Sequence, residues 1–504
     1  MQQKQRDYAY ILDNLDSAEG YTDSNPEEVR RWRRTVFAAI EKERQEAVKA
    51  RAEAEKQRNI AEIAEDKARA VLDKIYFYEE KFGLAYDENT GNYGFIDKDL
   101  NTKIDFKYQE ALPFDDTGFA RVRKGGTAFL VDTFGREYKL ATNLEDLDST
   151  VVALNLSHNE LTTIPPEVFQ YPQLKILNLS GNELTVLPPE IGQLTQLNYL
   201  HLGWNKITRL PEEIGQLTRL TSLRLGGNRL THLSPVVGQM RELQSLYLFY
   251  NKIEDLPSEI GQLLHLNTLY LYNNHLHDLP AEFWSLARLR SLHLGGNQLD
   301  TLPANIRQLT RLNELHLGRN LLQFLPAEIG TLQQLRLLDV RSNELEALPA
   351  SIGQLNNLVE LDLRSNKIAV LPPEIGQLQQ LRILDLGYNN LTRIPVNIGK
   401  LRYLEKMYLF DNQLTKLPDE CAQLKELQTL NLYKNKLTAL PKNIGQLRKL
   451  EEMDVAMNAI SDLPPSMAQL DWLTNLNIWG NRLSAAQRAS LKKMLPYCTI
   501  KSEE

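Results

Sequence analysis

The chain has 504 residues, of which 24% are charged, and its formal net charge is −7. A mildly acidic chain lacks the dominant basic face of a nucleic-acid-binding protein, which excludes nucleic acid as the main partner. Its only two cysteines, Cys421 and Cys498, exclude a disulfide framework and fit a reducing compartment. No segment has the apolar run of a signal peptide or of a membrane span, so we expect a cytoplasmic protein without membrane insertion.

An irregular segment, residues 1–25, precedes a predicted long helix over residues 26–80. Asn25 and Pro26 supply a helix cap and a first-turn proline, and an acidic residue, Glu27, follows. Small apolar residues recur at spacings of three and four along this helix and form a narrow seam. The seam fits either a coiled coil, through which the chain self-associates or docks to another helix, or a single charged helix acting as a spacer of about 80 Å.

Residues 81–140 predict a small β-rich module with an internal repeat. The tripeptide at residues 95–97 (FID) returns at residues 130–132 as LVD, 35 residues later. This pattern resembles the bacterial WG-repeat family, although residues 93–94 are YG and residues 128–129 are AF where that family has Trp-Gly. The resemblance implies a β-repeat module with a binding role. A simple β-rich cap for the array that follows is an equally good interpretation.

A 23-residue repeat fills residues 141–483. Its unit around Asn182 has the sequence LKILNLSGNELTVLPPEIGQLTQL, and the apolar offsets return in almost every unit. The alternation in LxLxxN is typical of a half-buried strand, and the proline that follows, such as Pro188, ends the strand. Fifteen asparagines mark the period of 23 residues: Asn159, Asn182, Asn205, Asn228, Asn251, Asn274, Asn297, Asn320, Asn343, Asn366, Asn389, Asn412, Asn435, Asn458 and Asn481.

These units resemble the leucine-rich repeat family, in its bacterial 23-residue class with an LPxxIGQL second half. The resemblance implies an α/β solenoid, curved like a horseshoe, with parallel strands on the concave face. We interpret the asparagines as a buried spine that satisfies backbone groups at the turns, and Cys421 as a small core residue. Residues 484–504 leave the repeat, and the spacing of Ser484 and Gln487 predicts a capping box and a helical C-terminal cap.

The repeat register places aromatic side chains on the concave face. Leu246 and Leu248 face the core, so Tyr247 and Phe249 lie on the opposite face. Neighbouring strands are about 4.8 Å apart, so rings of successive repeats form clusters, which usually mark an interaction surface. Ring packing that only stiffens the sheet is the alternative. The predicted protein-binding residues are His201, Trp204, Tyr247, Phe249, Tyr250, Tyr270, Tyr272, His293, His316, Arg319, Arg341, Arg364, Tyr408, Phe410, Tyr433 and Trp479.

A charged stretch with Asp339, Asp362 and Asp385 separates two aromatic clusters, and a solvated, self-compensating ladder is its simplest interpretation. His293, His316 and Asp339 share one offset on three successive strands and are metal-ligating residue types. The outer two Cα atoms would lie about 10 Å apart, so the sequence predicts no shared metal ion and no cofactor.

The sequence contains no phosphate loop, no kinase signature, no GxSxG and no HExxH, so we expect no enzymatic activity. The favoured function is a scaffold that recognises a protein partner through the concave face of the array. The alternative is a regulatory sensor in intracellular signal transduction, associated with small GTPases or with immune-like systems.

Overall fold

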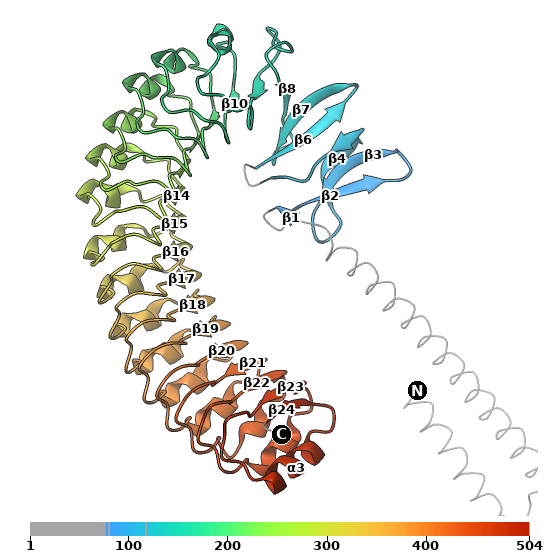
Figure 1. Cartoon of the computed structure of the whole chain (residues 1–504), viewed down its shortest axis with the longest axis vertical. Helices are drawn as coiled ribbons and strands as arrows, with labels where there is room; N and C mark the ends of the chain where they lie inside the picture. Colours follow the sequence, from blue (N-terminus) through green and yellow to red (C-terminus); the bar gives the residue numbers. More distant parts are fainter. Residues whose placement is uncertain (1–76, 79–80, 116–117, 503–504) are drawn as a thin grey trace, which may run out of the picture. The chain divides into compact units, whose positions relative to one another are not determined.

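The computed structural model describes three stretches of the chain: residues 77–78, 81–115 and 118–502. They form two compact units, of which the first ends at Glu137 and the second begins at Tyr138 (Figure 1). The helix predicted over residues 26–80 lies outside the described residues except at Phe77 and Tyr78. These two residues form a strand, so the helix prediction is wrong at its C-terminal end.

The first unit is an antiparallel β module. Its strands are β1 (Phe77–Tyr78), β2 (Phe82–Asp87), β3 (Asn92–Ile96), β4 (Thr102–Tyr108), β5 (Glu110–Ala111), β6 (Phe119–Lys124) and β7 (Thr127–Asp132). β1 to β4 pair in chain order, and β5, β6 and β7 form a second antiparallel group. Phe95, Tyr108, Phe114 and Val131 are buried at the centre of its core.

The internal repeat of this module is a repeated turn. Oδ1 of Asp97 accepts the backbone N–H groups of Asp99 and Asn101, at 3.0 and 2.8 Å. Oδ1 of Asp132 accepts the N–H groups two and four residues further on, both at 3.0 Å. An aspartate that satisfies the turn after a strand explains why Asp ends both tripeptides found in the sequence.

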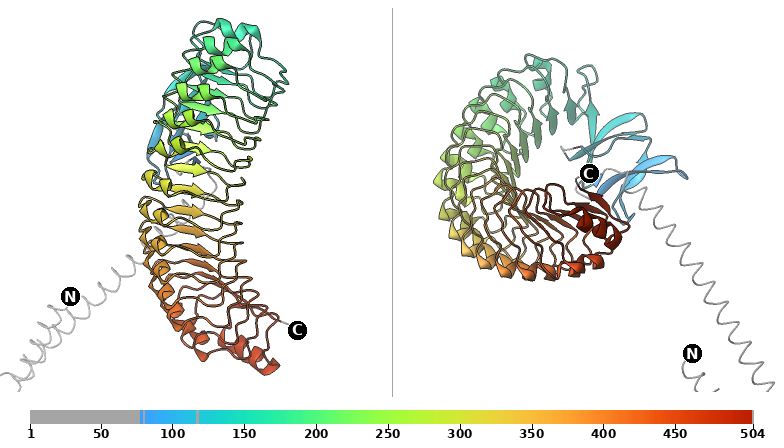
Figure 2. Two further views of the ribbon diagram at one scale, coloured as in Figure 1. Left: turned by 90° about the vertical axis from the view of Figure 1, so that its left-hand side faces the viewer. Right: turned by 60° about the horizontal axis from the view of Figure 1, so that its bottom comes forward.

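The second unit is a curved array of parallel strands that pair in chain order (Figures 1 and 2). From β9 to β23 the register partners are 23 residues apart, as in the pair Leu246 and Leu269. The strands are β8 (Glu137–Ala141), β9 (Ala153–Asn155), β10 (Ile176–Asn178), β11 (Tyr199–His201), β12 (Ser222–Arg224), β13 (Ser245–Tyr247), β14 (Thr268–Tyr270), β15 (Ser291–His293), β16 (Glu314–His316), β17 (Leu337–Asp339), β18 (Glu360–Asp362), β19 (Ile383–Asp385), β20 (Lys406–Tyr408), β21 (Thr429–Asn431), β22 (Glu452–Asp454), β23 (Asn475–Asn477) and β24 (Thr499–Lys501).

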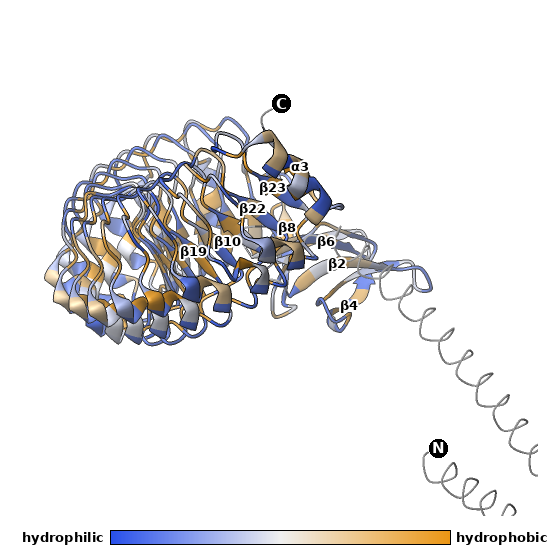
Figure 3. Ribbon diagram, turned by 90° about the horizontal axis from the view of Figure 1, so that it is seen from below, coloured by the Kyte–Doolittle hydropathy of each residue, from blue (hydrophilic) through white to orange (hydrophobic). Residues whose placement is uncertain are grey.

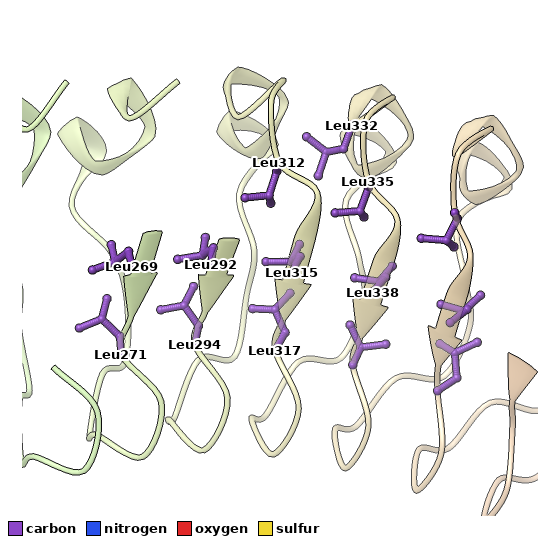
Figure 4. Close-up of a cluster of buried hydrophobic side chains, with 14 of the residues drawn as sticks. Leu269, Leu271, Leu292, Leu294, Leu312, Leu315, Leu317, Leu332, Leu335 and Leu338 are labelled. Carbon is purple, nitrogen blue, oxygen red and sulfur yellow. The ribbon is translucent and has the colours of Figure 1, made fainter. Parts of the chain in front are cut away.

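The leucines of the repeats form one continuous core. In each unit the central strand leucine and the leucine two residues later face inward, and equivalent pairs stack from repeat to repeat, as Leu269 and Leu271 do on Leu292 and Leu294 (Figure 4). Hydrophobic segments therefore recur along the whole curved array (Figure 3). A fully buried leucine contributes about 1.5–3 kcal/mol, and a slip of one residue would expose the whole set. This penalty fixes which side chains reach the concave face.

The second half of each repeat forms a 3-10 helix, so the helical layer of the predicted α/β solenoid is not α-helical. A proline in the extended conformation precedes most of these helices. Each helix is therefore short, and the next core leucine follows directly after it. A Cβ atom on Gly192 would lie 2.7 Å from the backbone oxygen of Glu213, so the glycine of LPxxIGQL permits close stacking of these turns. The 3-10 helices are Pro166–Gln170, Pro189–Gln193, Glu212–Gln216, Pro235–Gln239, Ser258–Gln262, Ala281–Ser285, Ala304–Gln308, Ala327–Thr331, Ala350–Gln354, Pro373–Gln377, Val396–Lys400, Asp419–Gln423, Ile444–Gln446 and Pro465–Gln469.

One α-helix occurs in the described residues, α3 (Ala485–Met494), after the last repeat. Ser484 and Gln487 form the expected capping box at its start, and Leu491 is buried against the array. None of the helices among residues 77–78, 81–115 and 118–502 combines the length and apolar character needed to cross a membrane.

The asparagines form the expected spine. Nδ2 of Asn274 donates to the carbonyl oxygens of Leu271 and Leu248, at 2.9 and 3.0 Å, and its Oδ1 accepts the N–H of Ile253 at 3.0 Å. Most of the series is buried and bonded in this way. Asn159 is an exception and is exposed, because the first repeat has no earlier repeat to supply the second carbonyl.

Candidate protein-binding surface

Besides the residues that begin each strand, such as Ser245, two rows of side chains cross the strands on the concave face, because each strand presents alternate residues to that side. The first row consists of the last residue of each strand. In chain order from β12 it contains Arg224, Tyr247, Tyr270, His293 and His316, followed by the aspartates that end β17, β18 and β19. The second row lies two residues later. A third position follows it, immediately before the spine asparagine, where the backbone takes a left-handed turn.

Six rings from three repeats meet on this face, and we name them the aromatic cluster: Trp204, Tyr247, Phe249, Tyr250, Tyr270 and Tyr272. Phe249 and Tyr272 stack with centroids 4.9 Å apart and planes only 2° from parallel. The Tyr247 ring packs edge-on against the Tyr270 ring with centroids 5.1 Å apart, and the centroids of the Tyr250 and Trp204 rings are 6.1 Å apart. Such ring pairs contribute about 0.5–1.5 kcal/mol each beyond the area they bury.

The cluster is partly open to solvent. Trp204 is 57% exposed and Tyr250 is 50% exposed, whereas Tyr247, Tyr270 and the stacked pair are half-buried. The guanidinium of Arg224 lies 4.3 Å from the Tyr247 ring centroid. Burial raises the pKa of Tyr270. The rings therefore pack on one another and also leave apolar surface uncovered, which combines the two alternatives drawn from the sequence.

The two most exposed rings stand on a strained backbone. Trp204 has φ 56° and Tyr250 has φ 51°, in the left-handed region that disfavours bulky residues. Gly181 and Gly227 occupy the same offset in neighbouring repeats, with φ 67° and 71°. The same left-handed offset carries Ser342, Lys434 and other non-glycine residues in later repeats, so this backbone belongs to the repeat turn, and Trp204 and Tyr250 place large rings on it.

Glycines also make room for the rings. A Cβ atom on Gly226 would lie 2.5 Å from the Phe249 ring, and one on Gly387 would lie 2.3 Å from the Phe410 ring. Each glycine precedes its phenylalanine by one repeat. A glycine one repeat before a phenylalanine is therefore a sequence signal for a ring that lies against the preceding repeat.

The second predicted cluster is less continuous. Tyr408, Phe410 and Tyr433 are half-buried, and Trp479 is exposed. In the described part of the chain, the ring contact found for Phe410 is with Tyr388, edge-on at 5.1 Å. Tyr388 was not among the predicted residues, although it is 54% exposed, has φ 53° and shares the offset of Trp204 and Tyr250.

His201 is a neutral member of the predicted set. Burial, followed by the nearby positive charge of Arg224, lowers its pKa to about 3. Its ring lies edge-on to Tyr199 with centroids 6.3 Å apart. An uncharged imidazole at pH 7 adds no cationic contact to the aromatic cluster.

The charged stretch is not a solvated ladder as expected. Asp339 and Asp362 are only 7% and 9% exposed. Arg364 contacts Asp362 at 3.2 Å and Asp385 at 3.9 Å, and Arg341 lies 3.7 Å from Asp362. The arginines thus compensate aspartates that are buried beneath them. Burial raises the pKa of Asp385 to about 6, and Arg319, in the left-handed position, remains exposed.

The chain matches family profiles over both units. The profile described as leucine-rich repeat region matches residues 155–252, 236–323 and 360–437, and a second leucine-rich repeat profile matches residues 310–368. The profile of the WG containing repeat matches residues 93–127. Both resemblances drawn from the sequence are therefore confirmed. A comparison with curated proteins finds no match.

Several solved structures resemble the array. A leucine-rich repeat protein of Leptospira interrogans is 39% identical, with a TM-score of 0.68, and the match covers 72% of this chain and 99% of that protein. A plant peptide hormone receptor, RGFR1 in complex with RGF2, is 29% identical, with a TM-score of 0.61, and coverage is 73% of this chain and 66% of the receptor. YopM from Yersinia enterocolitica is 27% identical, with a TM-score of 0.52, and coverage is 67% and 71%.

Proposed function

The chain belongs to the leucine-rich repeat family, a typical protein–protein interaction scaffold, and on that premise we propose that it binds a protein partner through the concave face of its array. The supporting observation is the aromatic cluster, in which rings from three repeats leave apolar surface open. Interfaces are enriched in tyrosine, tryptophan and arginine, and a few such residues dominate their binding energy. Nothing in the described part of the chain points to catalysis.

The cluster suits an extended segment of the partner. Its rings repeat with the strand spacing, so they form a row of shallow sites about 5 Å apart across neighbouring strands. The similar plant receptor was solved in complex with a peptide hormone ligand, RGF2, which supports this kind of partner. On the far side of the cluster, the compensated aspartates and the exposed Arg319 form a polar rim. No observation favours the signalling alternative, so we propose the scaffold alone.

The positions of Tyr250 and Trp204 add weight to this proposal. The left-handed turn before the spine asparagine recurs in most repeats and carries glycine, serine and charged residues elsewhere, so the turn itself does not require a ring at either position. Both rings are half-exposed and leave apolar surface that a partner would cover.

Full-length protein, immobilised as bait in an extract of the source cells, tests the proposal. Once a bound protein is identified, Tyr250→Ala or Tyr272→Ala is expected to weaken it by about 2 kcal/mol, roughly 30-fold, with little change in melting temperature. Trp472→Ala is the matched control, because Trp472 is exposed but lies outside the concave rows. Equal affinities of the wild type and both tyrosine variants would refute concave-face binding.

A further inference from the structure

Three potential metal ligands converge beside the aromatic cluster. His293 ends β15, and Glu314 and His316 begin and end β16. Each offers one ligand atom, and these atoms all lie within 4.8 Å of one another. Glu314 and His316 are two residues apart on one strand and therefore point to the same face. Glu314 stands two residues before the offset shared by His293, His316 and Asp339, so that shared offset alone does not reveal it.

We propose that His293, Glu314 and His316 bind a divalent transition-metal ion of the zinc class. Two imidazoles and one carboxylate are the donor set that zinc accepts in tetrahedral sites, with one coordination position left for water or for a group of a partner. Ligand atoms around tetrahedral zinc are about 3.3 Å apart, given metal–ligand distances of about 2.0–2.1 Å. Binding therefore requires the ligand atoms to approach one another by up to about 1.5 Å.

The surrounding groups hold two of these ligands in place. Oγ of Ser291 donates to Oε2 of Glu314 at 3.0 Å and lies 3.0 Å from Nε2 of His293. Oδ2 of Asp339 lies 3.6 Å from Nδ1 of His316, so this carboxylate would orient the imidazole through a hydrogen bond only after approaching it by about 0.5 Å. Asp339 is itself held by the backbone N–H of Arg341 at 3.1 Å. These contacts resemble the outer shell of known metal sites.

The imidazoles have room to move toward an ion. Their rings are stacked with centroids 4.0 Å apart and planes 28° from parallel, so each must rotate for its nitrogen to face a common ion. Both line a hollow of about 280 Å³ on the concave face, which supplies the space for this rotation. The Tyr270 ring packs on the other face of the His293 imidazole, with ring centroids 3.9 Å apart, and limits how far the imidazole can turn.

The test uses full-length protein freed of metal with a chelator and titrated with Co²⁺, then with Zn²⁺, by calorimetry and visible absorption. We expect one ion per chain and the intense absorption bands of tetrahedral Co²⁺. Glu314→Gln keeps the shape of a half-exposed side chain and should weaken binding at least tenfold, and His293→Gln with His316→Gln at least 100-fold. His265→Gln, which removes an exposed histidine outside the cluster, is the matched control and should bind as the wild type does.

Two results would overturn the proposal. One is wild-type protein that takes up no Co²⁺ at micromolar concentrations. The other is a folded double variant, with the circular dichroism spectrum of the wild type, that binds Co²⁺ equally tightly. Loss of partner binding plays no part in either result, so the metal site stands or fails independently of the proposed scaffold function.

Discussion

The asparagine spine allows a quantitative prediction about the stability of the array. In Asn274→Ala, the N–H of Ile253 loses the acceptor that it has at 3.0 Å and is left unpaired in the core. The carbonyls of Leu248 and Leu271 each lose one donor but keep another, from Asn251 and Asn297 respectively. An unpaired buried N–H costs about 1–3 kcal/mol, and each weakened carbonyl costs less, so the variant should lose about 3 kcal/mol.

The shared carbonyl makes adjacent substitutions cooperative. In Asn274→Ala combined with Asn297→Ala, the oxygen of Leu271 loses both of its amide donors. We therefore expect a loss that exceeds the sum of the two single losses by about 1–2 kcal/mol. Asn274→Ala combined with Asn366→Ala leaves no carbonyl without a donor, because their acceptors are different, and should be additive.

Urea unfolding of full-length protein, followed by circular dichroism, measures these free energies. Equal m-values among the variants are required for the comparison, because a change in m would mean a change in the unfolding unit. An adjacent pair that is as additive as the distant pair would refute the idea that each carbonyl depends on two asparagines.

Three further predictions concern single side chains. Tyr250→Gly should be more stable than Tyr250→Ala by about 1 kcal/mol in urea unfolding, because glycine adopts the left-handed φ without strain. Elsewhere alanine is usually the more stable of the two, and an alanine variant more stable than the glycine variant would show that this position is not strained. Because the pKa of Asp385 is about 6 in the folded chain and 3.8 is its ordinary value, the folded state binds the proton more tightly, so stability falls as pH rises from about 4 to 6. Asp385→Asn should therefore stabilise the protein by about 3 kcal/mol at pH 7 and by nothing below pH 4, and a constant difference at all pH values would contradict this. Burial raises the pKa of Cys421 to about 12, so a thiol reagent should label the partly exposed Cys498 in folded protein and Cys421 only in denaturant, which mass spectrometry can verify.

The predicted solenoid depends on local rules that need no tertiary information. A leucine at every second strand position must be buried, and one insertion-free period of 23 residues keeps all strands in the same register. The turn that follows β3 is also local, as the hydrogen bonds of Asp97 show. The spine bonds cross between repeats, as the bond from the N–H of Ile253 to Asn274 does, and the constant period aligns their partners. The sequence could not distinguish a 3-10 helix from an α-helix in the LPxxIGQL half. That choice depends on how closely successive turns stack against Gly192 and its equivalents.

The surface was predictable only in outline. Alternation along a strand assigns Tyr247 and Phe249 to the concave face, but it says nothing about how rings of different repeats share that face. Their exposure depends on contacts across strands, such as the stacking of Phe249 on Tyr272. The charged stretch shows the same limit, because a pattern of alternating charges does not reveal that Asp339 is buried under its arginines.

The amino-acid sequence by itself determined the repeat, its register and the face to which each side chain points, because these follow from chain stereochemistry and the burial of leucine. Only the tertiary structure decided which of the outward side chains touch, which are strained and which are buried. It placed Glu314 of β16 close to His293 of the neighbouring strand β15, and it placed Tyr250 in a left-handed turn. Distances between strands and the curvature of the array set those contacts, and neither is encoded in any single repeat.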